Sequence, residues 1–295
     1  MWIIAGTLPD PDFALCAPRI AAPDPSATIE KDRLVLRDGR AVPVERGTAA
    51  LAAACIATCG ALGVPPPELA LAGDTGSGNG SRDVYALLTA RLAEFRPRGI
   101  FFHYLFPDVD WHNRVLMAAQ ALAPQPLLMA DAGFMYVAKM SGYAAEYDLF
   151  TPDAGELAFL ADEKAPHPFY TRGFLLQNDH DIPPLLERLR ANGQYPRHLL
   201  VKGETDYIVE NGDVVATVGA PSEPAMECIG GTGDIVAGLT AAFAVLGLPP
   251  GRAALTAARA ARLLARRCRP RPDTQAGELV RALPETLAET LPLLL

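Results

Sequence analysis

Short apolar runs alternate with alanine- and leucine-rich stretches along most of this chain. Such alternation is typical of βα units wound around a mostly parallel sheet, because each buried strand is followed by a helix that covers it. We expect strands at residues 2–5, 69–72, 99–104, 127–130, 147–150 and 198–201. We expect helices between them at residues 48–62, 82–95, 111–122, 133–140, 154–161 and 184–191. The pattern predicts a three-layer α/β/α sandwich.

Two stretches break this alternation. Residues 33–44 and 205–218 each have the pattern of strand, tight turn and strand, with Asp38-Gly39 and Asn211-Gly212 at the turns. After residue 229 the sequence predicts helices only, at 234–246, 251–267 and 276–287. We therefore expect residues 1–295 to form a single domain with a mostly parallel central sheet and small hairpin insertions.

Composition and charge indicate a chain with a large core and argue against nucleic-acid binding. Of the residues, 50% are hydrophobic, so the chain can bury a large core without disulfides or metals. The net charge of −8 argues against nucleic-acid binding, which needs a basic face to neutralise phosphates. The arginines between residues 262 and 271 form a basic cluster that could bind an anion locally, although we expect a solvated helix end.

No segment has the character of a membrane span. The N-terminus lacks a basic region, and the longest apolar stretch, residues 235–248, is too short to cross a bilayer. The five cysteines are scattered and odd in number, unlike a disulfide framework. We expect a soluble, cytoplasmic protein whose partners are small molecules, and a homo-oligomer is compatible with the sequence.

A glycine-rich segment, residues 73–81, follows an expected strand and opens a helix. It lacks the lysine of a Walker A loop and the spacing of Gly-x-Gly-x-x-Gly. Two interpretations stay open: a flexible loop that lines a ligand, or a plain turn into a helix capped by Ser81. Asp74, at the end of the strand, is the residue of this loop that we expect to contact a substrate.

A second glycine-rich segment, Gly230-Gly231-Thr232-Gly233-Asp234, runs into an apolar helix. Its glycines let backbone N–H groups approach an anion closely, and the helix adds the positive end of its dipole. Thr232 is the expected N-cap. Asp234 has two explanations: a favourable charge in the first helical turn, or a general base that takes a proton from a substrate hydroxyl.

Charged residues follow three further expected strands, at the sheet edge where α/β ligand sites form. Asp131 is either a helix cap or a substrate contact. Asp153 and Glu156 have the spacing of a capping box, and the same spacing suits two oxygen ligands of a hydrated Mg²⁺. Lys202, followed by Gly203, places an ammonium group where nucleotide phosphates would lie.

Taken together, these motifs resemble the ribokinase-like superfamily, whose members carry a Gly-x-Gly-Asp turn near the C-terminus and an Asn-x-x-Glu motif upstream. Within it, the chain looks most similar to the ADP/ATP-dependent NAD(P)H-hydrate dehydratases of the carbohydrate-kinase-like branch. Their Thr-Pro-His-Pro-Gly-Glu, Lys-Gly and Gly-Gly-Ser-Gly-Asp motifs correspond to residues 151–156, 202–203 and 230–234. Asp153 and Ala154 depart from the His and second Pro of the first motif, and no fused epimerase domain is expected.

The resemblance implies a ribokinase-like fold, ATP or ADP with Mg²⁺ as cofactors, and a small-molecule substrate. It implies Asp234 as the base, Asp153 and Glu156 near Mg²⁺, and substrate contacts at Asp131 and Asp153. Nucleotide or phosphate contacts are implied at Lys202, Gly203, Gly230, Gly231, Thr232 and Gly233. Three functions stay open: a dehydratase that phosphorylates hydrated NAD(P)H and then eliminates phosphate, a kinase for a sugar or vitamin precursor, and a nucleotide-binding module without catalysis.

Overall fold

The computed structural model describes residues 1–22, 24–165 and 181–294. Its centre is one eight-stranded sheet of order β11-β10-β9-β8-β7-β6-β1-β5. The strands from β9 to β5 are parallel, and the hairpin of β10 and β11 adds an antiparallel edge. The strands are β1 (Trp2–Leu8), β5 (Glu68–Gly73), β6 (Gly99–His103), β7 (Leu127–Ala130), β8 (Leu149–Phe150), β9 (His198–Val201), β10 (Asp206–Glu210) and β11 (Asp213–Val218).

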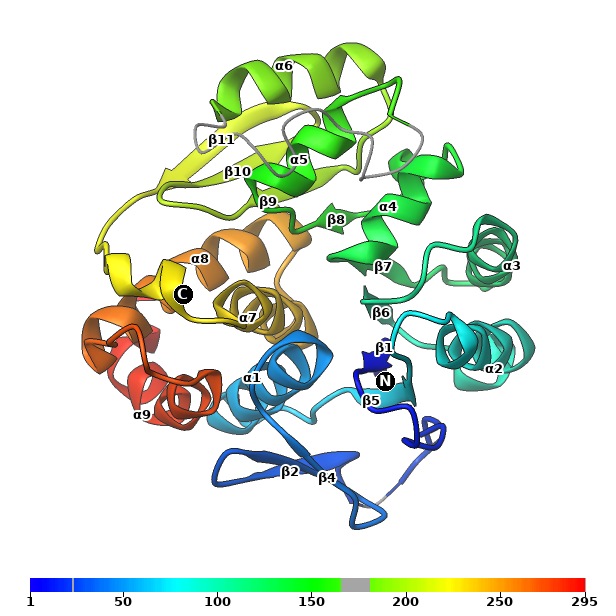
Figure 1. Ribbon diagram of the computed structural model, residues 1–295, viewed down its shortest axis with the longest axis horizontal. Helices are drawn as coiled ribbons and strands as arrows, with labels where there is room; N and C mark the ends of the chain where they lie inside the picture. The colour runs from blue at the N-terminus through cyan, green and yellow to red at the C-terminus, as the bar shows by residue number, and fades with distance from the viewer. Residues whose placement is uncertain (23, 166–180, 295) are drawn as a thin grey trace.

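Helices cover both faces of this sheet and make three layers (Figure 1). One face carries α1 (Gly47–Leu62), α7 (Thr232–Leu246), α8 (Pro250–Cys268) and α9 (Ala276–Leu294). The other carries α2 (Asn79–Phe95), α3 (Val109–Gln120), α4 (Gly133–Met140), α5 (Ala154–Ala161) and α6 (Ile182–Asn192). Two short 3₁₀ segments are η1 (Ala144–Glu146) and η3 (Pro224–Cys228).

Alternate side chains of each strand enter two separate cores, because successive Cβ atoms point to opposite faces of a sheet. On β1, Ile4 packs with the α1 layer and Ile3 with the α2 layer. Phe101 and Phe102 divide in the same way on β6. Burial on both faces explains why the central strands are continuous apolar runs in the sequence.

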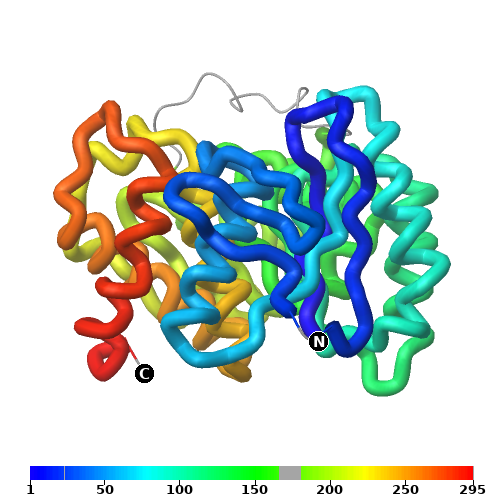
Figure 2. Tube along the Cα trace, turned by 90° about the horizontal axis from the view of Figure 1, so that it is seen from below, coloured from blue at the N-terminus to red at the C-terminus, as the bar shows by residue number. Residues whose placement is uncertain are grey.

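A separate antiparallel sheet is formed by β2 (Ala27–Glu30), β3 (Arg33–Leu36) and β4 (Ala41–Pro43). The predicted hairpin of residues 33–44 is confirmed, whereas β2 was missed because its four residues carry little apolar patterning. Leu34 and Leu36 bury one side of this sheet in the core that contains α1. Figure 2 shows this sheet as a blue segment between the red C-terminal helix and the dark blue N-terminal segment.

The predicted α/β/α class is confirmed, and each expected strand and helix coincides with an observed element. Helix α9 continues to Leu294, beyond the predicted end at residue 287, with Pro284 and Pro292 inside it. Among the described residues, no helix combines the length and apolarity needed to cross a membrane.

Candidate active site

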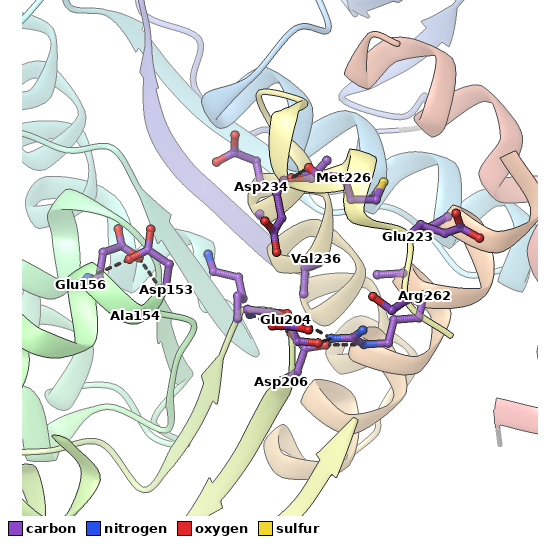
Figure 3. Close-up of a pocket in the computed structure, with 18 of the residues that line it drawn as sticks. Asp153, Ala154, Glu156, Glu204, Asp206, Glu223, Met226, Asp234, Val236 and Arg262 are labelled. Atoms are coloured by element: carbon purple, nitrogen blue, oxygen red, sulfur yellow. Dashed lines mark hydrogen bonds and ion pairs between the residues drawn. The ribbon is translucent and has the colours of Figure 1, made fainter. Parts of the chain in front are cut away.

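The ends of β7 and β9 and the first turns of α5 and α7 meet at one edge of the large sheet, around a cavity of about 760 Å³. Figure 3 shows Asp153 and Glu156 on one side, Arg262 and Glu223 on the other, and Asp234 between them. The predicted site residues that line the cavity are Asp131, Asp153, Glu156, Lys202, Gly203, Thr232, Gly233 and Asp234. Four segments that are far apart in the sequence therefore contribute to one cavity.

Lys202 and Asp131 form an ion pair in the cavity wall. The Lys202 Nζ atom lies 3.0 and 2.9 Å from the two carboxylate oxygens, and the side chains are 13% and 2% exposed. Burial lowers the pKa of Lys202, but the charges of Asp131 and Glu156 outweigh burial and raise that pKa well above its usual value. The ammonium group is therefore charged within the site.

Asp234 lies in the first turn of α7 and is held from two sides. Its Oδ2 accepts a hydrogen bond of 2.6 Å from the backbone N–H of Gly47, and its Oδ1 lies 3.1 Å from Nε2 of His103. Burial raises the pKa of Asp234, but His103, the charge of Lys202 and the Gly47 N–H together hold it below its usual value. The carboxylate is ionised at neutral pH and borders the cavity.

The start of α7 differs from the prediction, because its N-cap is Gly231 and not Thr232. Gly231 has φ +92°, and a Cβ atom there would lie 2.7 Å from the Glu45 carbonyl oxygen, so both conformation and space require glycine. The Thr232 hydroxyl instead donates to the carbonyls of Met226 and Ile229. In the described part of the chain no side chain caps this turn, so its N–H groups are available to an anion.

Asp153 and Glu156 form the predicted capping box at the start of α5. Asp153 Oδ1 accepts from the Glu156 N–H at 2.8 Å, and Glu156 Oε2 accepts from the Asp153 N–H at 2.9 Å. Burial, followed by the charges of Asp131 and Asp153, raises the pKa of Glu156 to about 8, although Lys202 opposes this shift. Carboxyl oxygens are hard donors of the kind that Mg²⁺ prefers. The neighbouring carboxyl groups of Asp153 and Glu156 therefore fit a Mg²⁺ ion held through water.

The loop of residues 73–81 is organised around Asp74. Its carboxylate accepts hydrogen bonds from the N–H groups of Gly76, Gly78 and Ser81 and from the Ser81 hydroxyl. The N-cap of α2 is Gly78, so the expected cap at Ser81 is wrong. Asp74, Gly230 and Gly231 are not among the described residues that line the cavity, and their ligand contacts remain predictions.

Two residues at the site were not identified from the sequence. Arg262 donates from Nε to Asp206 at 2.9 Å and from Nη2 to the carbonyls of Gly203 and Glu204, with its side chain 11% exposed. It fastens α8 to the turn before β10, so the expectation of a solvated helix end is wrong for this arginine. His103 ends the apolar run of β6, and a polar residue at the end of a buried strand is the signal that could have identified it.

His103, Asp131 and Asp234 place potential ligand atoms within 4.8 Å of one another, a spacing that could hold a metal ion. The Lys202 ammonium, however, already lies against both oxygens of Asp131. A divalent cation between these groups would be repelled by that ammonium at short range. The charge of this cluster is balanced by lysine.

Comparisons with known proteins concern the sequence and the fold of the chain. The chain is 36% identical over 220 residues to the uncharacterized protein MJ1337 of Methanocaldococcus jannaschii, covering 74% of this chain and 90% of that protein. No protein-family profile matches the sequence.

Two solved structures have a similar fold. A ribokinase-like superfamily protein from Enterococcus faecalis has a TM-score of 0.54 at 17% identity, covering 81% of each chain. The tetrameric inhibited form of phosphofructokinase-2 from Escherichia coli has a TM-score of 0.51 at 14% identity, covering 96% of this chain and 98% of that one. At such identities the similarity establishes a ribokinase-like fold.

Proposed function

This chain belongs to the family of the Methanocaldococcus jannaschii protein, and from the geometry of its own site we propose that it transfers a phosphoryl group from a nucleotide to a hydroxyl of a small molecule. The position of Asp234 carries the proposal. An ionised carboxylate, the N-terminal end of α7 and the Lys202 ammonium share the wall of one cavity. A base beside an anion site is the combination that phosphoryl transfer to an alcohol requires.

Each group then has a role in the transfer. Asp234 takes the proton of the acceptor hydroxyl as the oxygen bonds to the terminal phosphorus, and the bond from that phosphorus to the nucleoside diphosphate breaks. The N–H groups of the first turn of α7 and the Lys202 ammonium stabilise the charge on the phosphate oxygens. Mg²⁺, held through water by Asp153 and Glu156, would supply further neutralisation of that charge.

The walls of the cavity favour one orientation of the two substrates. Val236 from α7 and Ala261 and Ala265 from α8 make an apolar wall beyond the phosphate site. Such a wall suits the flat face of a nucleobase, so we assign the nucleotide to this side. The acceptor then lies on the side of Asp131 and Glu156, within reach of the Asp234 carboxylate.

The variant Asp234→Asn tests the proposal, because it removes the base and keeps the size of the side chain. We expect kcat for acceptor-dependent ATP consumption to fall roughly 10²-fold or more, while ATP affinity measured by calorimetry stays close to that of the wild type. The acceptor panel contains sugars and vitamin precursors, and mass spectrometry identifies the phosphoester. Asp83→Asn, at an exposed position of α2, is the matched control. Wild-type turnover by Asp234→Asn would contradict the proposal.

A second candidate function has the same phosphorylation step. Residues 153–156 and 232–234, which belong to the motifs similar to those of hydrate dehydratases, line the cavity together. This supports hydrated NAD(P)H as an alternative acceptor, from which elimination of the new phosphate would restore the nicotinamide ring. Incubation with hydrated NADH, ATP or ADP, and Mg²⁺ should then restore the absorbance of reduced nicotinamide and release inorganic phosphate.

The same assays distinguish both enzymes from a third possibility, a nucleotide-binding module without catalysis. A kinase gives a stable phosphoester, and a dehydratase gives free phosphate with recovered NADH. A nucleotide-binding module would bind ATP in both the wild type and Asp234→Asn and would turn over none of the acceptors.

A further inference from the structure

We propose that His103 is a positioning residue that orients the Asp234 carboxylate for proton abstraction, through a buried chain from Thr48 to His103 to Asp234. The inference rests on the proposed role of Asp234. It concerns a residue of β6 that belongs to none of the motifs described above.

The imidazole of His103 is fully buried and makes a polar contact at each ring nitrogen. Nδ1 lies 2.9 Å from the hydroxyl oxygen of Thr48, and Nε2 lies 3.1 Å from Asp234 Oδ1. Within the described residues Nε2 has no hydrogen bond of standard geometry, so the ion-pair contact with Asp234 is its polar partner. Catalytic contacts are often poorly aligned before substrate binds and tighten in the complex.

The contacts select one tautomer. When the Thr48 hydroxyl donates to Nδ1, the proton of a neutral imidazole is on Nε2, the ring nitrogen that lies 3.1 Å from Asp234 Oδ1. The opposite tautomer would direct a lone pair of Nε2 at an ionised carboxylate, which is repulsive. The Asp234 carboxylate therefore favours the tautomer with its proton on Nε2, and the Thr48 hydroxyl supports this tautomer by donating to Nδ1.

Close packing of the backbone keeps Thr48 and His103 in place. A Cβ atom on Gly6 of β1 would lie 2.4 Å from the His103 carbonyl oxygen and 2.8 Å from Thr48 Cγ2. Glycine at this position lets β1, β6 and the first turn of α1 meet directly. Thr48 is 1% exposed. The imidazole is held on rigid elements, as a supporting residue of a catalytic group should be.

Both oxygens of Asp234 are then oriented by the fold. Oδ2 is held by the Gly47 N–H and Oδ1 by His103, and each oxygen keeps a second lone pair for the acceptor proton. The other titratable groups around Asp234 are Lys202, Asp131, Glu156 and Tyr104. Lys202 is already paired with Asp131, so among these titratable groups His103 is the side chain that contacts the Asp234 carboxylate.

The kinetic test compares His103→Gln with His112→Gln. His112 is equally buried, but its Nε2 pairs with the Tyr147 hydroxyl on the far side of the sheet, so its replacement controls for loss of a buried histidine. We expect His103→Gln to lower kcat roughly 10- to 100-fold with little change in nucleotide KM. The acid limb of its pH profile should move to higher pH, because Asp234 loses a donor to its ionised form. Thr48→Val, which removes the hydroxyl, should lower kcat and move the acid limb in the same direction but less. Thr48→Ser, which keeps the hydroxyl, should have the kcat and pH profile of the wild type.

A second measurement needs no activity and separates this inference from the proposed function. The ¹³C NMR signals of labelled aspartate carboxyl groups are followed as a function of pH in the full-length folded wild type and in His103→Gln. The variant Asp234→Asn assigns the Asp234 signal. We expect the Asp234 midpoint to move to higher pH in His103→Gln and to stay in place in His112→Gln.

An unchanged Asp234 midpoint in His103→Gln would overturn the inference, even if phosphoryl transfer is found. Stoichiometric binding of Zn²⁺ or Mn²⁺ by the wild type that His103→Gln abolishes would overturn it as well, by making His103 a metal ligand. If no acceptor is ever phosphorylated while the midpoint shifts, the proposed function fails and the positioning of Asp234 by His103 stands.

Discussion

The ammonium group of Lys202 lies 2.9 and 3.0 Å from the two carboxylate oxygens of Asp131 and so joins the ends of β9 and β7 across the short strand β8. The register of the sheet produces this contact. Lys202 pairs with Asp153 as an isolated parallel bridge that continues the pairing of β8 with β9. One ion pair therefore connects the phosphate side of the cavity to the strand that carries the proposed acceptor side.

Lys202→Met should destabilise the chain by about 3–5 kcal/mol, because it leaves the Asp131 carboxylate buried without its counter-charge. The double variant Asp131→Asn with Lys202→Met removes both charges, and we expect it to recover a large part of that loss. Urea unfolding followed by circular dichroism measures both. Equal losses in the single and double variants would show that the buried charge is not the cause.

Glu156 should make the stability of the chain depend on pH. Its folded pKa of about 8 lies above the ordinary value of 4.5, so between these values the folded state retains a proton that the unfolded chain has released. The free energy of unfolding therefore falls as pH rises through this window. Glu156→Gln should lessen that fall, and Glu187→Gln, exposed on α6, should not. Urea titrations at about pH 5 and about pH 8 with EDTA present measure the difference.

The capping box at α5 separates the structural role of Asp153 from its proposed role near Mg²⁺. Asp153→Ala removes the cap and should cost about 0.5–2 kcal/mol of stability. Asp153→Asn keeps an N-cap oxygen and loses the charge, so we expect near wild-type stability and a higher Mg²⁺ concentration for half-maximal activity. An unchanged Mg²⁺ requirement in Asp153→Asn would limit Asp153 to the capping role.

Gly238 sets the distance between α7 and α1. A Cβ atom there would lie 2.3 Å from the Leu51 carbonyl oxygen and 2.9 Å from the Ala54 Cβ. Gly238→Ala should therefore lower the free energy of unfolding by about 1–3 kcal/mol. It should also lower kcat, because separating the helices lengthens the hydrogen bond from the Gly47 N–H to Asp234. Gly60→Ala, in α1 with nothing within 4 Å of the new methyl group, should instead stabilise by about 0.5–1 kcal/mol. Thermal unfolding of both variants gives the comparison.

Local patterns in the sequence determined the layers and the sheet edge at which the candidate site lies. Buried strands gave apolar runs, covering helices gave their own period, and the Asp38-Gly39 and Asn211-Gly212 turns marked the two hairpins. Because parallel strands end at the same edge, Asp131, Asp153 and Lys202 could be expected together without any knowledge of contacts. The capping box of Asp153 and Glu156 was also readable, since it spans a single helical turn.

Only the tertiary structure decided how each charged group is satisfied. The sequence places an aspartate at the end of two strands, yet Asp74 is enclosed by the N–H groups of its own loop while Asp131 meets Lys202, 71 positions away. Asp234 likewise receives its donors from Gly47 and His103, which reach it through the packing of α1 and β6. Periodicity and turn chemistry are properties of neighbours along the chain, whereas pKa values and hydrogen-bond partners depend on groups that the fold brings together. Asp234, the proposed base, could therefore be named from the sequence, whereas the groups that surround it could not.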